Sequence, residues 1–397
     1  RDSGSLHMSM QVDLRNPELG YFDEGMNLSD AAVYRDACLP FGQATKLPPV
    51  AYRSKVFLEL ESEKVWTRSW VAIGLQQQIP NAGDLLPMTI GMHGIHAQRQ
   101  ADGSISARMN RHQHGGCRFV PEQCRSGRQT KCSITSCNYT RDSDVMLANP
   151  NGENTDLMYK FVGLTPERLA AVKFETWGPF LFVNLDPECE PLATQLGGLR
   201  AAMGDDFGLS LTLSAKSWID FKCNWKLAAS ALSRPAAPVE PANKYLNAEA
   251  CYSSIEGPYA LSNSSAKMVW LFPNLLFSIE DDSIAVVLLQ STGVEKTLAR
   301  CFWLAPKSET ISQTTERFVQ WTSLIQKHGT QAEQTHRDYA AMGAATHHDA
   351  GTDDLLLEDN IGAYNLNQFL AYRLPLEHRY YWNAPIMDAA MMQRRAR

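Results

Sequence analysis

The sequence lacks long hydrophobic runs and long runs of a single charge sign. Its most apolar stretches, such as residues 284–289 and 180–183, are far shorter than the roughly 20 residues that a membrane-spanning helix needs. The 37 basic and 43 acidic residues give a formal charge of -6 and form no basic cluster. This leaves no surface suited to a nucleic-acid backbone or an anionic bilayer, so neither is an expected partner.

The sequence also lacks an apolar signal core near its start and a regular cysteine framework. Residues 1–10 are interpreted as a tag remnant followed by a start. Nine cysteines is an odd number and no secretory signal precedes them, so we expect free thiols in a reducing cytoplasm. Five of the cysteines are scattered singly: Cys38, Cys189, Cys223, Cys251 and Cys301.

A chain of 397 residues is too long for one ordinary core, so two or three domains are expected. After an N-terminal segment at residues 11–50, the apolar spacing predicts a helix over 54–66, with Ser54 as its N-cap. Short apolar pieces separated by turn residues predict a small antiparallel β domain over 51–168. Strands interrupted by Gly-Pro are predicted over 172–185.

Strand-like runs followed by helical patterns predict an antiparallel sheet covered by helices, and hence an α+β domain over 169–397. The first helix is expected to stop at Gly329, and the second is a long C-terminal helix. The runs lie at residues 268–277, 283–290 and 297–304, and the helices at 309–327 and 355–370.

Two short motifs in the first predicted domain have the form of paired metal-ligand loops. Asn110-Arg-His112 is followed by Cys132-Ser-Ile-Thr135, about where a Rieske protein places its C-x-H and C-x-x-H pairs. Further matching segments follow in the same order, so the sequence resembles the α subunits of Rieske-type non-heme iron aromatic-ring-hydroxylating oxygenases. These later segments are residues 175–186, 223–226, 270–274 and 358–359.

The resemblance implies an N-terminal antiparallel β Rieske-like domain and a helix-grip (START-like) antiparallel sheet domain with a long C-terminal helix. It also implies assembly as a trimer or hexamer, in which electrons pass from the cluster of one subunit to the iron of the next. The cluster of that family needs two thiolates on one iron and two imidazoles on the other.

Only half of the cluster ligands implied by the resemblance are present. His112 and Cys132 match, whereas Asn110 and Thr135 stand where the family has a Cys and a His. An amide and a hydroxyl are poor ligands for a cluster iron, so we expect no 2Fe-2S cluster.

The resemblance also implies a mononuclear iron held by two histidines and an aspartate. Ala236 and Glu240 fall at or near the histidine positions, and no histidine occurs between His114 and His328. Asp359 alone matches, so we expect no mononuclear iron and no oxygenase chemistry. The acidic bridge between the two metal centres is replaced by Ser230 and Ser233.

A cluster of histidines and cysteines leaves a structural zinc site open as an alternative, because zinc accepts both thiolate and imidazole. The spacing matches no familiar zinc motif, so buried or loop thiols are the competing interpretation. The adjacent His347 and His348, followed by Asp349, are interpreted as a solvated turn. The zinc candidates are His112, His114, Cys117, Cys124, Cys132 and Cys137.

The segments that match the family are present, whereas most of its metal ligands are replaced. The sequence therefore predicts a catalytically silent subunit that assembles with an active oxygenase paralogue and supports it. The first alternative is a repurposed helix-grip enzyme, non-oxidative, metal-free or zinc-dependent, of lyase or hydratase type, which acts on a hydrophobic substrate. Its candidate groups are Glu240, Asp359 and Tyr245, although the favoured interpretation is that Glu240 is exposed to solvent and Asp359 caps or braces a helix. A protein that binds a small molecule without turnover is the remaining alternative.

Overall fold

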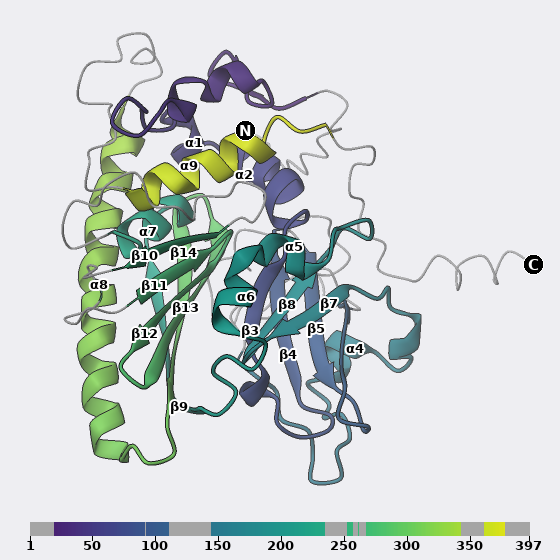
Figure 1. Ribbon diagram of the computed structural model, residues 1–397. Helices are drawn as coiled ribbons and strands as arrows, with labels where there is room; N and C mark the ends of the chain where they lie inside the picture. Colours follow the sequence, from purple (N-terminus) through teal and green to yellow (C-terminus); the bar gives the residue numbers. More distant parts are fainter. Residues whose placement is uncertain are drawn as a thin grey trace, which may run out of the picture.

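The computed structural model describes residues 20–91, 93–110, 144–234, 252–256, 261, 267–342 and 361–377. Figure 1 shows helices packed on one side of a large sheet, with two smaller sheets beyond its other side. All strand pairs in these described sheets are antiparallel. This combination of helices with antiparallel sheets confirms the predicted α+β class.

The N-terminal segment, residues 20–66, consists of short elements. Ser54 is an N-cap, because its Oγ accepts a hydrogen bond from the N–H of Phe57 at 3.0 Å. The predicted helix over 54–66 is observed as α2, which widens in its last part into the π-type turn η4. The elements are β1 Phe22–Asp23, β2 Met26–Asn27, η2 Ala31–Tyr34, η3 Asp36–Cys38, α1 Val50–Arg53, α2 Lys55–Glu61 and η4 Ser62–Trp66.

Two three-stranded sheets follow, in the orders β3-β8-β7 and β4-β5-β6. β7 and β8 lie beyond residue 168 in the sequence, yet β8 pairs with β3, so this β structure continues to Asn184. Gly178-Pro179 separates the two strands, as predicted. The strands are β3 Val71–Leu75, β4 Leu85–Ile90, β5 His93–Arg99, β6 Ile105–Met109, β7 Lys173–Trp177 and β8 Phe180–Asn184, and the helices are η5 Gln76–Gln78, α4 Tyr159–Val162, η6 Pro166–Arg168, α5 Leu192–Leu196 and α6 Gly198–Met203.

The large sheet has six strands in the order β10-β11-β12-β13-β14-β9. The prediction of a single strand over 268–277 is wrong, because β11 ends at Leu271 and pairs with β12, which begins at Leu275. The chain turns at Pro273, since proline has no N–H to donate to a strand ladder. The strands are β9 Thr212–Phe221, β10 Tyr252–Glu256, β11 Lys267–Leu271, β12 Leu275–Glu280, β13 Ser283–Gly293 and β14 Lys296–Ala305.

Each face of the six-stranded sheet has its own apolar core. Trp270 and Trp303 belong to the core on the helical side, whereas Phe277 and Phe302 belong to the core that faces β3 and β8. This division follows from the pleat, because successive side chains of a strand point to opposite faces. The helices on the first face are α7 Trp225–Leu232, α8 Ile311–Ala341 and α9 Ile361–Arg373.

The predicted end of the first long helix at Gly329 is wrong, because α8 continues to Ala341. A Cβ added to Gly329 would lie 2.0 Å from Cε1 of Phe221 on β9. This glycine therefore allows the helix to approach the sheet closely and does not terminate it. The second predicted helix is observed as α9 from Ile361 onward, and its expected start at residues 355–360 lies outside the described residues.

In the described ranges, no helix is both long enough and apolar enough to span a membrane. The cysteines that the structure describes are all free thiols, namely Cys38, Cys189, Cys223 and Cys301.

Candidate functional site

Most of the predicted ligand positions lie outside the described residues. Asn110, Ser230 and Ser233 are described: the first directly follows β6, and the serines lie on and just after α7. The structure thus describes elements that lead to both expected metal sites. The predicted residues that lie outside the described ranges are His112, His114, Cys117, Cys124, Cys132, Thr135, Cys137, Ala236, Glu240, Tyr245, His347, His348, Asp349 and Asp359.

Asn110 forms a buried hydrogen bond with His96 of β5. The two side chains are 1% and 2% exposed, and His96 Nδ1 lies 2.8 Å from Asn110 Oδ1. Because an amide oxygen can only accept, the imidazole is the donor. Burial lowers the pKa of His96 to about 4, against the raising effect of the hydrogen bond to Asn110. His96 is therefore neutral at pH 7.

The start of α7 is tied to two distant parts of the chain through Asn224. Its side-chain oxygen accepts from the N–H of Lys226 at 3.2 Å, as an N-cap. Its amide nitrogen donates to the carbonyl of Tyr52 at 3.3 Å and to that of Val294 at 3.0 Å. The N-terminal segment and the β13–β14 turn therefore meet at the same end of α7.

Lys226 and Glu61 form an ion pair that is closed to solvent. Lys226 Nζ lies 2.6 Å from Glu61 Oε1, and both side chains are 0% exposed. The indole N–H of Trp225 donates to the other carboxylate oxygen of Glu61 at 3.1 Å. Burial raises the pKa of Glu61 and lowers that of Lys226, and the opposite charge of each partner counteracts the shift. Each charge is therefore stabilised by the other.

Three aromatic rings surround the ammonium group of Lys226. Its Nζ lies 5.0 Å from the ring centroid of Phe57, 5.5 Å from that of Tyr52 and 5.6 Å from that of Trp225. Cation–π attraction of this kind offsets part of the lost hydration. Both side chains of the ion pair are closed to solvent, so the group exposes no reactive atom.

Ser230 and Ser233 form local hydrogen bonds on and just after α7. Ser230 Oγ donates to the carbonyl of Lys226 at 2.8 Å, and Ser233 Oγ donates to the carbonyl of Ser230 at 3.4 Å. α9 packs closely against this end, since a Cβ added to Gly362 would lie 2.1 Å from Ser233 Oγ. The positions at which the resemblance implies acidic residues therefore carry neutral hydroxyls that bond to the backbone.

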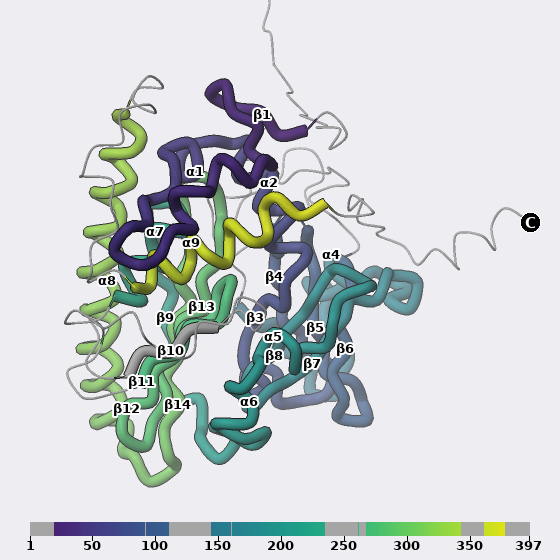
Figure 2. The backbone as a smooth tube through the Cα atoms, turned by 45° about the horizontal axis from the view of Figure 1, so that its top comes forward, coloured from purple at the N-terminus to yellow at the C-terminus, as the bar shows by residue number. Residues whose placement is uncertain are grey.

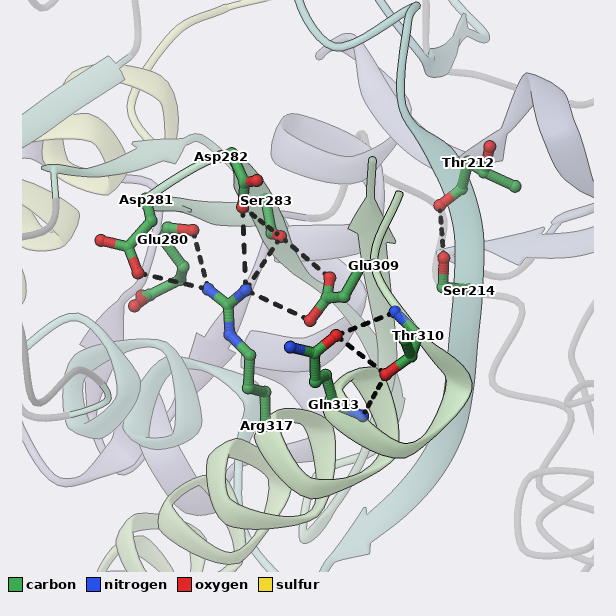
Figure 3. Close-up of polar contacts among 10 residues, drawn as sticks. All are labelled: Thr212, Ser214, Glu280, Asp281, Asp282, Ser283, Glu309, Thr310, Gln313 and Arg317. Carbon is green, nitrogen blue, oxygen red and sulfur yellow. Dashed lines mark hydrogen bonds and ion pairs between the residues drawn. The ribbon is translucent and has the colours of Figure 1, made fainter. Parts of the chain in front are cut away.

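A surface pocket of about 320 Å³ lies at the N-terminal end of α8, away from these residues. In Figure 3, Arg317 points toward the β12–β13 turn, where it donates to the carbonyl of Glu280 at 3.0 Å. It also donates to Oε1 of Glu309, which lies just before α8, at 3.2 Å. These contacts fix the start of α8 to the turn, and the carboxylates favour a cationic group over an anionic one. The lining residues are Asp282, Ser308, Glu309, Gln313, Glu316 and Arg317.

The described ranges contain no group of three or more His, Cys, Asp or Glu side chains placed to hold a metal ion. The histidines and cysteines proposed as zinc ligands lie in residues 112–137, outside the described ranges.

Comparison with curated proteins finds relatives that match part of the chain, although no family model matches it. Biphenyl 2,3-dioxygenase subunit alpha of Rhodococcus jostii strain RHA1 is 27% identical over 191 residues, covering 46% of this chain and 40% of that protein. Benzene 1,2-dioxygenase subunit alpha of Pseudomonas putida is 26% identical over 193 residues, covering 47% and 41%. The match thus spans about two fifths of the length of these relatives.

Solved structures with the same fold match most of the chain. A quaternary ammonium Rieske monooxygenase has a TM-score of 0.55 at 17% identity, covering 87% of this chain and 98% of that one. Naphthalene 1,2-dioxygenase has a TM-score of 0.57 at 13% identity, covering 88% and 96%. At these identities the structural likeness establishes the fold, and the sequence relatives show homology over slightly less than half of the chain. The chain is a homologue of Rieske oxygenase α subunits.

The sequence identified the Rieske oxygenase resemblance but not the buried polar contacts beside the expected metal sites. Lys226 stands in an otherwise apolar helix, which is a signal that a buried lysine needs a partner. Nothing local to Lys226 points to Glu61, which lies 165 residues away in the chain. His96 lies in a strand of mostly buried residues, which favours a neutral imidazole but does not identify Asn110.

Proposed function

We propose that this chain is a catalytically silent Rieske oxygenase-like subunit that assembles with an active oxygenase paralogue, as a trimer or hexamer, and supports it. The observation that carries this proposal is the type of side chain found at each ligand position that the resemblance implies. The fold of the family is retained, whereas the side chains offered to both metal centres are chemically unsuited to them.

The donor set for the cluster does not fit a 2Fe-2S centre. Asn110 takes the place of a thiolate, and its side-chain oxygen is engaged at 2.8 Å by the buried His96. Thr135 takes the place of an imidazole. One thiolate and one imidazole remain, which is half of what the mixed ligand set requires.

The donor set for mononuclear iron is deficient for a separate reason. We propose that the six-stranded sheet with α7, α8 and α9 is the helix-grip domain, within residues 169–397, and that residues 51–168 include the Rieske-like domain. The stretch after α7 contains no histidine, because none occurs between His114 and His328. Asp359 alone does not make a two-histidine, one-carboxylate site.

Metal analysis of anaerobically purified protein, by plasma mass spectrometry together with the visible spectrum, tests the loss of both centres. We expect no iron and no red-brown cluster absorption. About three irons per chain with a cluster spectrum would overturn the proposal, because that is the content of a working Rieske oxygenase α subunit. About one zinc without iron would support loss of the iron centres and place a structural metal among the histidines and cysteines of residues 112–137.

Coexpression with the oxygenase paralogue from the same source tests the supporting role. We expect the two chains to copurify and the paralogue to gain soluble yield or turnover. An unrelated oxygenase α subunit is the matched control and should gain neither. Failure to copurify with the paralogue would refute the supporting role, even if the metal analysis shows that both centres are absent.

A further inference from the structure

The N-terminal segment contacts all three helices of the helical layer at one end of that layer. We propose that this segment fixes the positions of α7, α8 and α9 relative to one another, and that Glu61 is the residue that positions α7. This inference goes beyond the proposed silent function and holds whether or not the chain binds iron. Figure 2 shows the segment lying across α9 and reaching the end of α8.

The contact with α7 is directional. The two carboxylate oxygens of Glu61 bind consecutive residues, one accepting from Lys226 Nζ at 2.6 Å and the other from Trp225 Nε1 at 3.1 Å. Consecutive residues of a helix point about 100° apart, so the two bonds together fix the rotation of α7 about its axis. A purely apolar contact would leave that rotation less defined.

The contact with α8 is made at the C-terminus of the helix. Arg53 binds Glu24 through two nitrogens, at 2.8 and 2.9 Å, and donates to the carbonyl of Tyr339 at 3.1 Å and to that of Met342. A guanidinium at the last carbonyls of a helix is favoured by the helix dipole. Tyr52 stacks on Tyr339 with ring centroids 4.5 Å apart.

The contact with α9 follows its outer face. Gln368 Nε2 donates to the carbonyl of Ala37 at 2.8 Å, and Phe41 packs edge-on against Tyr364 with centroids 5.2 Å apart. Just beyond the helix, Lys64 Nζ donates to the carbonyl of Leu376. The segment therefore contacts α9 at two positions about one turn apart, and also contacts the chain just beyond the helix.

The contact with α8 lies where the chain leaves that helix, whereas the contact with α7 lies at the start of that helix. α7 ends at Leu232 before residues 235–251, and residues 343–360 connect the end of α8 to the start of α9. The two stretches carry Glu240, Tyr245 and Asp359. The N-terminal segment therefore acts on the helices that flank these stretches.

The variant Glu61→Gln tests the positioning role, with Glu63→Gln as its matched control. Glu63 pairs with Arg68 at 3.4 Å rather than with α7. Hydrogen exchange measured by mass spectrometry should rise about tenfold or more in peptides that cover α7 and the start of α9, with little change in β13 and β14. The Glu63→Gln protein should show no such local increase. An equal increase throughout the Glu61→Gln protein, or no increase, would overturn the proposal.

The double variant Glu61→Leu with Lys226→Met separates positioning from charge neutralisation, and it remains informative if Glu61→Gln does not fold. Replacing both partners with apolar side chains removes the unpaired charge, so we expect a melting temperature close to that of the parent chain. If Glu61 positions α7, exchange in α7 stays raised in this variant. If exchange returns to the parent level, Glu61 only neutralises Lys226 and the proposal fails.

Discussion

Two buried polar contacts, one in the β region and one at the start of α7, differ in charge. In the β region, His96 and Asn110 form one neutral hydrogen bond of 2.8 Å. Beside α7, Glu61 and Lys226 form a fully buried ion pair that also uses an indole N–H and three aromatic rings. The neutral pair carries no net charge, whereas the charged pair is surrounded by a group of partners, because removing ions from water costs several kcal/mol per ion.

This difference shows which of the two regions is more sensitive to the loss of one partner. A neutral donor or acceptor left alone costs the desolvation of one dipole. A charged group left without a partner in the interior costs more free energy. Its pKa shifts in the direction that favours the uncharged form. We therefore expect the α7 region to tolerate single substitutions of its buried pair less well than the region around His96.

The largest effect is expected for Lys226→Met. The change leaves the carboxylate of Glu61 buried without its ammonium partner, which should lower the free energy of unfolding by about 3–5 kcal/mol. Urea denaturation measures it. Lys216→Met is the control, because Lys216 pairs with Asp144 with its side chain 47% exposed and should change stability by about 1 kcal/mol or less. Equal effects of the two variants would show that the buried ion pair is no more sensitive to the loss of one partner than an exposed ion pair.

Acid sensitivity is the next effect and comes from His96. Its pKa is about 4 in the folded chain against an ordinary 6.5, so the unfolded chain binds the proton first as the pH falls. Stability from this group is complete above pH 6.5 and is lost progressively toward pH 4, by about 3 kcal/mol.

His96→Gln keeps a side-chain amide that can donate to Asn110 but has no group that titrates in this range. The variant should lose less stability than the parent between pH 6.5 and pH 4 in thermal unfolding. His93→Gln, on the same strand, is the matched control. A variant whose stability falls as steeply as that of the parent would show that His96 does not carry the acid sensitivity.

A smaller effect is expected for Gly329→Ala, which tests the packing of α8 on the six-stranded sheet. Alanine favours a helix over glycine by about 1 kcal/mol, yet its Cβ would meet the ring of Phe221 at 2.0 Å. We expect a net destabilisation of about 1–3 kcal/mol by thermal unfolding. Combining it with Phe221→Leu should recover part of the loss, and a stabilised single variant would show that the helix is not pressed against the sheet.

The smallest effect is expected for Ser54→Ala in the N-terminal segment. The change removes the acceptor for the N–H of Phe57 and should cost about 1 kcal/mol in chemical denaturation. Ser214→Ala is a suitable control, because Ser214 is exposed and donates only to the carbonyl of Thr212 (Figure 3). Indistinguishable stabilities of the two variants would show that the N-cap of α2 contributes nothing to holding the segment.

Features that depend on a few neighbouring residues were predictable. Ser54 was recognised as an N-cap because capping acts over three residues, and the break at Gly178-Pro179 was recognised because these residues interrupt regular structure locally. The run over 268–277 was misread because its apolar character hid the turn at Pro273. Gly329 was misread because its reason is the ring of Phe221, which lies on another element.

The candidate site was predictable in its residue types but not in its surroundings. Asn110 and Thr135 stand at the positions of a Cys and a His in the family pattern, and this can be read from the chain alone. The neighbour of Asn110 could not be predicted from the chain alone, because the pairing of β5 with β6 brings His96 next to Asn110.

The sequence by itself determined the α+β class, the likeness to Rieske oxygenase α subunits and the kinds of donor at the ligand positions, because these depend on composition, order and local pattern. The tertiary structure decided that Lys226 meets Glu61 from 165 residues away, that α8 runs past Gly329, and that one N-terminal segment contacts three helices. These outcomes depend on which buried surfaces meet. A polar group taken out of water must find a partner among whatever side chains the fold brings near it.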